Sequence, residues 1–319
     1  MTPNLVSIVI ICWNNWPDLE LAIQSALCQS YPEVEVIVVD NGSTDATPTE
    51  VPKLFGGAVR YLRQPLVKCG AGYNAGIRLA SGEFIQLLDG DDLLAPNKIG
   101  KQMDVFRADP DVDIVYGDFR KFQTLAEPAQ WEDLDAREQT DMLRFLITSD
   151  GRIAPNSFLY RRRVMEQVGT WDENLYITDL DYWLRAAWTG CRFRYCPGSL
   201  CFSRKRPDQM TSHHFAMFQG VEAVWNKALG YITAESYRRA VAARLARCRF
   251  LIAINRNGMT IQEALVKLSE ARAADPKKVN PLAFLMGALL ILLPGAHQLV
   301  RASWLKPVRQ WIGARMGLH

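Results

Sequence analysis

Short apolar runs alternate with helical patterns in the first part of the chain. Residues 5–12 form a nearly continuous apolar run with three consecutive β-branched residues, which is typical of a strand buried on both faces. Apolar positions then recur at 19, 22, 23, 26 and 27, the spacing of one helical face. A second apolar run, residues 34–39, ends at Asp40. This strand–helix–strand order predicts a βαβ unit with a parallel sheet.

The same alternation continues to about residue 120. We expect a strand at 58–62, a helix at 74–80, a strand at 84–88, a helix after Pro96 and a strand at 114–116. Such a doubly wound α/β layout binds ligands at the carboxyl ends of its strands. Asp40 and Asp89 each follow a predicted strand directly, so both carboxylates are expected at that edge of the sheet.

The remainder of the chain is first irregular and then helical. Residues 121–150 are more polar and less regular. A helix is expected at 182–189, where Gly190 would cap it, and two strands near 192–196 and 199–203.

From about residue 215 the pattern is helical. Thr260 and Glu263 form a capping box that opens a helix to about Ala274. We therefore place a domain boundary near 205–220, between a domain at 1–210 and a helical C-terminal region at 211–319.

The composition is that of a globular chain. Of its 319 residues, 49% are hydrophobic and 22% charged, which excludes a disordered chain and suggests about two domains. The net charge of +3 does not indicate a nucleic-acid partner. None of the seven cysteines forms a C-x-x-C pair, which favours reduced, buried thiols over a zinc site. No export signal accompanies residues 5–12, so we expect a cytoplasmic protein.

Two acidic turns follow the predicted strands. The turn that begins Asp40-Asn41 can accept hydrogen bonds from a ribose or a base, but its residues are also typical of an ordinary turn. In the second turn Asp89, Asp91 and Asp92 repel one another unless a cation lies among them. Oxygen ligands of this kind suit Mg²⁺ or Mn²⁺ together with phosphate. The alternative is a solvent-facing turn in which Asp92 caps a helix. The apolar strand before it favours the metal.

Two further segments are candidates for chemistry. Residues 70–75 match G-x-G-x-x-A, a relaxed dinucleotide fingerprint, but no strong strand directly precedes them and the expected acidic residue is missing. Contact between their backbone and a phosphate is the second possibility. Asp179 lies at the predicted start of a helix. It is either the helix N-cap or a general base that the helix N-terminus keeps ionised, and one residue can do both.

Taken together, these segments resemble family 2 glycosyltransferases of the GT-A fold. Residues 6–14 are similar to the family's opening strand, and residues 39–45 are similar to its nucleotide-binding turn. Residues 74–76 and 80–85 resemble the segments that lead to its D-x-D motif, which corresponds to 88–92. Residues 169–173 and 179–185 resemble its acceptor side. The likeness extends from about residue 5 to 206. Five motifs in this order and spacing are specific, although each alone is weak.

The resemblance implies a fold, a metal and a reaction. The fold would be a Rossmann-like α/β structure, with a mixed, mainly parallel sheet flanked by helices and a C-terminal helical extension. Asp91 would bind Mn²⁺ or Mg²⁺ bridging the diphosphate of a nucleotide-diphosphate sugar. Asp179 would deprotonate the acceptor hydroxyl, with inversion at the anomeric carbon. The nucleotide-sugar site would be formed by Asn14, Asp40, Asn41, Asn74, Asp89 and Arg206.

Several positions depart from the family's usual pattern. Ile11 and Cys12 replace a Pro-Thr pair, Thr178 replaces an acid, and Arg206 stands where a metal-proximal His is common. Arg206 can neutralise a diphosphate but cannot bind a metal. These departures motivate a second hypothesis, a catalytically inactive sugar-nucleotide-binding scaffold of a polysaccharide assembly complex. A nucleotidyltransferase lacks support, because no Gly-rich loop with a following Arg or Lys comes after the first strand.

The C-terminal region is basic. The 44 residues after Asp275 contain six cations and no acid, whereas residues 1–275 carry a net charge of −3. Apolar and cationic residues interleave between 301 and 315, and residues 279–300 carry no charge but are interrupted by Pro294-Gly295. Three alternatives follow: contact with an anionic membrane surface, packing on protein, or a membrane span. The first predicts a peripheral protein on the inner face of the cytoplasmic membrane, with a glycan or lipid-linked acceptor.

Overall fold

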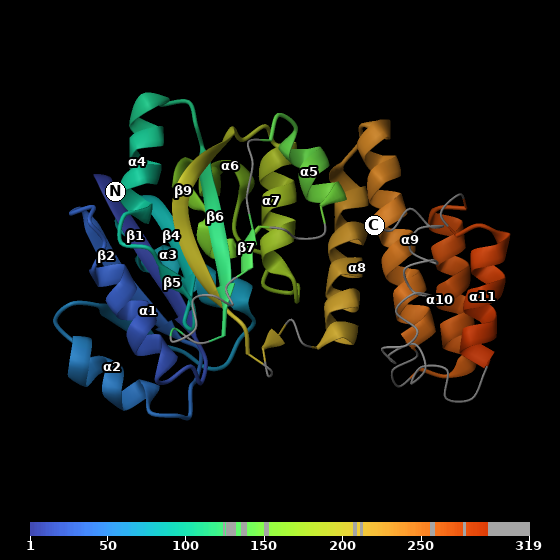
Figure 1. Ribbon diagram of the computed structural model, residues 1–319, viewed down its shortest axis with the longest axis horizontal. Helices are drawn as coiled ribbons and strands as arrows, with labels where there is room; N and C mark the ends of the chain where they lie inside the picture. The colour runs from blue at the N-terminus through green and yellow to red at the C-terminus, as the bar shows by residue number, and fades with distance from the viewer. Residues whose placement is uncertain are drawn as a thin grey trace. The chain divides into compact units, whose positions relative to one another are not determined.

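The computed structural model divides into two compact units, Met1–Asp208 and Gln209–His319. The first unit is α/β and the second is helical (Figure 1). The structure describes residues 1–123, 125, 132–134, 139–149, 153–206, 209–210, 213–255, 259–276 and 279–292.

One mixed sheet of nine strands forms the centre of the first unit. Its strand order is β3-β2-β1-β4-β8-β6-β9-β5, and β7 pairs with β6. The bounds are β1 (Thr2–Cys12), β2 (Val34–Asp40), β3 (Arg60–Arg63), β4 (Gly82–Asp89), β5 (Leu93–Leu94), β6 (Ile114–Phe122), β7 (Glu132–Leu134), β8 (Leu159–Arg161) and β9 (Phe193–Arg204). Strands β3, β2, β1 and β4 run parallel, as predicted, and β8 joins β4 antiparallel.

The strand register gathers acidic residues at one edge of this sheet. Cys12 of β1 lies opposite Asp40 of β2, and Ile11 lies opposite Asp89 of β4. The two carboxylates therefore leave the sheet on either side of the end of β1. This confirms the prediction that both belong to the carboxyl edge.

Helices cover both faces of the sheet. They are α1 (Asp18–Leu27), α2 (Thr47–Phe55), α3 (Cys69–Leu79), α4 (Lys98–Ala108), α5 (Met142–Thr148), α6 (Arg163–Val168) and α7 (Thr178–Trp188). Ile8 and Ile10 share a core cluster with residues of α1 and α4. Val9 points to the other face, where α3 comes so close that a Cβ on Gly76 would lie 2.2 Å from Val9 Cγ1.

Two sequence-based predictions of this unit are wrong in detail. The helix expected at 74–80 begins at Cys69, so the glycine-rich segment is helical rather than a loop. The two strands expected near 192–196 and 199–203 are one strand, β9. Gly198, which has a positive φ, lies within β9 where its pairing with β6 is interrupted. Residues 121–150, expected to be less regular, contain the end of β6, β7 and α5.

The second unit is helical, as the sequence pattern predicts. Its helices are α8 (His214–Tyr231), α9 (Glu235–Asn255), α10 (Ile261–Ala274) and α11 (Pro281–Leu292). The predicted capping box is confirmed, since Thr260 and Glu263 exchange both hydrogen bonds at the start of α10. None of the helices in the part of the chain described above is long and apolar enough to cross a membrane. The basic segment 301–315 lies outside the described residues.

Lys98, the first residue of α4, is buried in the first unit. Its amine donates hydrogen bonds to the side-chain oxygens of Gln86 and Gln102, the latter at 2.8 Å. Burial lowers the pKa of Lys98 from 10.5 to about 7. Above pH 7 the folded protein therefore holds a neutral lysine, whereas the unfolded chain keeps its proton.

This lysine should make stability depend on pH. Because the unfolded state binds the extra proton, we expect Lys98 to raise the free energy of unfolding between pH 7 and pH 9, by up to ~1.4 kcal/mol per pH unit. Lys98→Met removes this contribution, and Lys53→Met, on the exposed side of α2, retains it. Urea unfolding at both pH values measures the difference. Equal slopes in Lys98→Met and wild type would contradict a neutral buried amine.

Candidate functional site

Asp40 organises the turn that follows β2. Its side chain is fully buried, and Oδ1 accepts a hydrogen bond of 2.7 Å from the backbone N–H of Ser43. Its other oxygen, Oδ2, accepts one of 2.6 Å from the Tyr61 hydroxyl. Burial, with the adjacent Asp40, raises the pKa of Tyr61 above its ordinary value. The tyrosine thus stays protonated and fixes the carboxylate at the strand end.

Asn14 and Asn41 connect the ends of β1, β2 and β3. Asn14 has a left-handed backbone (φ 51°), and its Oδ1 accepts hydrogen bonds from the N–H groups of Thr44 (2.7 Å) and Asp45 (3.3 Å). Asn41 Oδ1 accepts one of 2.6 Å from Gln64 Nε2. Both predicted residues therefore lie beside Asp40 and shape the turn around it.

Asp89 and Asp91 flank a glycine at the end of β4. A Cβ on Gly90 would lie 2.8 Å from Cys12 Cβ, so the turn can follow this path only with glycine. Asp89 Oδ1 accepts a hydrogen bond of 2.8 Å from the Tyr73 hydroxyl. Oδ1 of Asn156 accepts a hydrogen bond of 3.0 Å from the backbone N–H of Asp89. No sequence motif indicated Asn156.

The charges of this turn are only partly compensated. Burial, followed by the charge of Asp91, raises the pKa of Asp89 to about 6. Burial also raises the pKa of Asp91, although the guanidinium of Arg206 acts against it. Two partly buried carboxylates that destabilise each other's ionised form favour a cation between or beside them.

The carboxylate oxygens of this turn suit a hard divalent ion that takes its remaining ligands from phosphate or water. Within the described ranges, no group of three or more His, Cys, Asp or Glu side chains is placed to hold a metal. Asp89 and Asp91 supply oxygen atoms only, the type of ligand that Mg²⁺ and Mn²⁺ accept. Such an ion would need phosphate or water oxygens to complete its coordination.

The end of β9 supplies the cations next to this turn. The backbone N–H of Arg204 donates to Asp92 Oδ1 at 2.7 Å, and its Nε donates to the carbonyl of Asp91 at 3.1 Å. Arg206 lies 3.7 Å from Asp18 of α1 and close enough to Asp91 to affect its pKa. The alternative role of Asp92 as a helix cap is wrong, because α4 begins only at Lys98.

Asp179 lies in the first turn of α7 and approaches Asp89 from another part of the sequence. The alternative that it is the N-cap is wrong, since Ile177 holds that position. Its Oδ1 accepts the N–H of Leu180 at 2.8 Å. Burial raises the pKa of Asp179, and its charge in turn raises the pKa of Asp89, Tyr73 and Cys69. Asp179 is therefore close enough to Asp89 for its charge to affect the pKa of that carboxylate.

Asn74 holds the segment that leads to α7. Its Nδ2 donates to the carbonyl of Trp171 (2.9 Å) and to Glu173 Oε1 (2.8 Å), and its Oδ1 accepts the N–H of Trp171 at 3.0 Å. Trp171 stacks on Tyr182 of α7, with ring centroids 3.5 Å apart. The structure thus gives Asn74 a positioning role, and its predicted contact with a nucleotide sugar stays a prediction.

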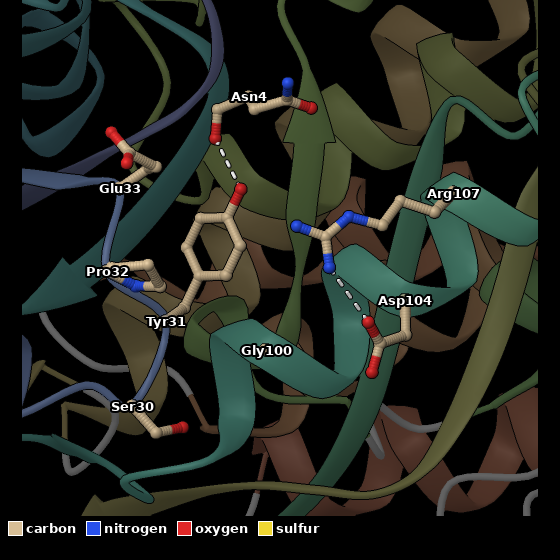
Figure 2. Close-up of a pocket in the computed structure, with 8 residues that line it drawn as sticks. All are labelled: Asn4, Ser30, Tyr31, Pro32, Glu33, Gly100, Asp104 and Arg107. Carbon is tan, nitrogen blue, oxygen red and sulfur yellow. Dashed lines mark hydrogen bonds and ion pairs between the residues drawn. The ribbon is translucent and has the colours of Figure 1, made fainter.

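A pocket of about 350 Å³ lies elsewhere, at the opposite edge of the sheet. Asn4 near the start of β1 lines it with residues that precede β2, among them Tyr31 (Figure 2). Tyr31 donates a hydrogen bond of 2.7 Å to the Asn4 carbonyl, and Arg107 donates one of 3.0 Å to Asp104. None of the predicted site residues lines this pocket.

Comparison with known proteins identifies the family. The model of Glycosyl transferase family 2 matches residues 7–169, which contain the turns of Asp40 and Asp89. The chain belongs to glycosyltransferase family 2. Two uncharacterised glycosyltransferases are among its relatives. That of Rickettsia typhi is 30% identical over 72% of this chain and 73% of its own length. That of Rickettsia conorii is 32% identical over 57% of this chain, which spans 31% of the relative's length.

Solved structures confirm the predicted GT-A-like α/β fold for this glycosyltransferase family 2 chain. Residues 1–349 of Staphylococcus aureus TarS, in complex with UDP-GlcNAc, align with a TM-score of 0.64 at 16% identity, over 95% of this chain and 92% of that one. A mannosyltransferase of Pyrobaculum calidifontis, in complex with GDP-Man and Mn²⁺, aligns with a TM-score of 0.59 at 19% identity, over 98% and 85%.

A buried polar chain supports the acidic turn of this family 2 protein and was missed by the sequence analysis. Asn156 donates to Asp92 Oδ2, and its carbonyl accepts a hydrogen bond of 2.9 Å from Gln86 Nε2. The side-chain oxygen of Gln86 in turn accepts a hydrogen bond from the amine of Lys98. The one visible signal was Gln86 itself, a polar residue inside the apolar run 84–88.

Proposed function

We propose that this chain transfers a sugar from a nucleotide-diphosphate sugar to a hydroxyl of a glycan or lipid-linked acceptor, with metal assistance and inversion. The observation that carries the proposal is the proximity of Asp179, in the first turn of α7, to Asp89 at the end of β4, where the charge of Asp179 raises the pKa of Asp89. A carboxylate for a metal, here Asp91, and a separate carboxylate for a proton, here Asp179, are the two parts that this reaction needs.

In this proposal the nucleotide binds along the carboxyl edge of the first strands. Asp40, Asn41 and Asn14 contact its base and ribose, and Asn74 completes that side. Asp89 contacts the ribose or the sugar. The proposal draws support from TarS, which binds UDP-GlcNAc, and from the mannosyltransferase, which binds GDP-Man.

The diphosphate would lie between Asp91 and Arg206. Asp91 would hold Mn²⁺ or Mg²⁺, and the mannosyltransferase structure contains Mn²⁺. The metal supplies positive charge for the phosphate oxygens as the nucleoside diphosphate leaves. Arg206 adds a second positive group, although it cannot coordinate metal.

Asp179 would act as the general base. It takes the proton of the acceptor hydroxyl, whose oxygen then forms the new bond to the anomeric carbon while the nucleoside diphosphate departs from the opposite face. This single displacement inverts the anomeric configuration. A base works best when its pKa approaches the operating pH, and burial moves the pKa of Asp179 upward in that direction.

The test is a panel of UDP, GDP, dTDP and CMP sugars, each with and without Mn²⁺ or Mg²⁺. At a hundredfold excess over Kd, a bound donor stabilises the fold by ~2.7 kcal/mol in thermal unfolding. Hydrolysis of the stabilising donor to a nucleoside diphosphate, and inverted anomers in NMR, would support the transfer reaction. Binding without any turnover would favour the inactive scaffold that the departures at Ile11, Thr178 and Arg206 motivate, and no binding would contradict both.

The two parts of the chain would have different tasks. We propose residues 1–210 as the glycosyltransferase domain and 211–319 as a helical region with a basic, membrane-contacting tail. The protein would then act in the cytoplasm, peripherally on the inner face of the membrane, where a lipid-linked acceptor is available. The basic charge after Asp275 supports this location.

A further inference from the structure

Helix α11 carries no polar side chain in its 12 residues, yet the burial of its described side chains is confined to one face. Ala283, Gly287 and Ile291 form the buried face. A Cβ on Gly287 would lie 2.9 Å from Leu268 Cδ1, so α11 packs tightly against α10 there. The other face exposes Leu285, Leu289 and Leu292, of which 57%, 51% and 53% are accessible. We refer to these three residues as the leucine stripe.

Such a stripe is unusual for a helix that faces water. Helices that are apolar all round are normally buried, and clustered exposed apolar side chains mark interaction sites. Twelve residues span about 18 Å, well short of the roughly 30 Å of a bilayer core. The geometry therefore suits a helix lying in the plane of a membrane interface, with its leucines at the acyl boundary.

The charge around α11 indicates which kind of partner binds the leucine stripe. Arg272 of α10 lies 5.2 Å from the ring centroid of Phe284, at the beginning of α11. Lys277 and Lys278 precede the helix, and no acidic residue follows Asp275. A second copy of the chain would bring the same positive charge to the contact, whereas anionic lipid headgroups would compensate it.

We propose that the leucine stripe is the surface through which this chain binds an anionic lipid bilayer. The leucines enter the interface, and the excess of cations over acids in the sequence after Asp275 attracts the anionic headgroups. This binding requires neither a sugar donor nor a metal, so it can hold or fail independently of the transfer reaction.

Co-sedimentation of the full chain with vesicles tests the proposal. The vesicles contain phosphatidylcholine alone or equal parts of phosphatidylcholine and phosphatidylglycerol. The variant is Leu285→Gln/Leu289→Gln/Leu292→Gln, and the matched control is Leu21→Gln/Leu54→Gln, two exposed leucines of the first unit. We expect wild type and control to bind anionic vesicles, and the triple variant to bind at least ~10-fold more weakly. High salt should weaken wild-type binding.

Three results would overturn the proposal. Wild type remains in the supernatant with anionic vesicles; the triple variant binds as wild type does, which places the contact outside α11; or size-exclusion chromatography shows a dimer that only the triple variant dissociates. Circular dichroism checks that the variant folds. If it does not, Leu289→Glu changes one exposed position and adds a negative charge there, and it must also weaken binding.

Discussion

Asp179→Asn should lower kcat by about 10³-fold, because an amide cannot take the proton of the acceptor hydroxyl. The substitution keeps the size of the side chain and its place in the first turn of α7. Donor binding should remain nearly unchanged, since the proposed donor site consists of other residues. Initial rates with the donor that the panel identifies, together with its Kd from titration calorimetry, measure the two effects separately.

The pH dependence provides an independent check of this role. A base must be ionised, so log kcat/KM of the wild type rises with pH up to the pKa of Asp179, which burial holds above the ordinary value of 3.8. Asp179→Asn should lose this acidic limb. The control Asp104→Asn changes an exposed carboxylate on α4 and should retain both rate and limb. An unchanged kcat in Asp179→Asn would assign the base to another residue.

Asp91→Asn should abolish metal-dependent donor binding and lower kcat/KM by about 10³-fold, equivalent to ~4 kcal/mol of transition-state stabilisation. In thermal unfolding, the stabilisation by donor and Mn²⁺ should disappear. Asp111→Asn, at an exposed position after α4, is the matched control and should behave as wild type. Stabilisation that persists with Mn²⁺ in Asp91→Asn would show that the metal is bound elsewhere.

In the absence of donor and metal, Asp91→Asn should make the folded protein more stable. The pKa of Asp89 is about 6, so the folded state holds a proton between pH 4 and pH 6 that the unfolded state has lost. The protonated Asp89 therefore contributes fully to the free energy of unfolding below its ordinary pKa of 3.8. This contribution is lost as the pH rises through 6. Because Asp91 is one cause of the raised pKa, Asp91→Asn should increase unfolding free energy at pH 7. Loss of both ligand binding and stability would instead indicate a folding defect.

The parallel strands were predictable because they are buried on both faces. Continuous apolar runs at 5–12, 34–39 and 84–88 correspond to β1, β2 and β4, each within a few residues. β8 could not be found in this way, since it has three residues and owes its conformation to pairing with β4 and β6. Likewise β9 runs through Pro197-Gly198, a typical turn signal, because its pairing with β6 resumes beyond a break.

The site was predictable only in part. Asp40 and Asp89 directly follow apolar strands, so their place at one edge could be read from the chain. The hydrogen bonds of Asn156 to Asp89 and Asp92 join residues 67 and 64 positions apart, and no local pattern reports them. Asn74 shows the same limit, because its partners are about a hundred residues away.

By itself, the sequence determined the order of strands and helices in the first half of the chain, the acidic strand ends and the likeness to family 2 glycosyltransferases. These features follow from local periodicity and from motifs, which need no knowledge of distant contacts. The tertiary structure alone decided that Asn156 supports the turn of Asp89, that Arg204 holds the turn of Asp91, and that α11 leaves its leucines exposed. Each of these depends on which elements pack together, and packing is set by the fit of distant surfaces rather than by neighbours along the chain.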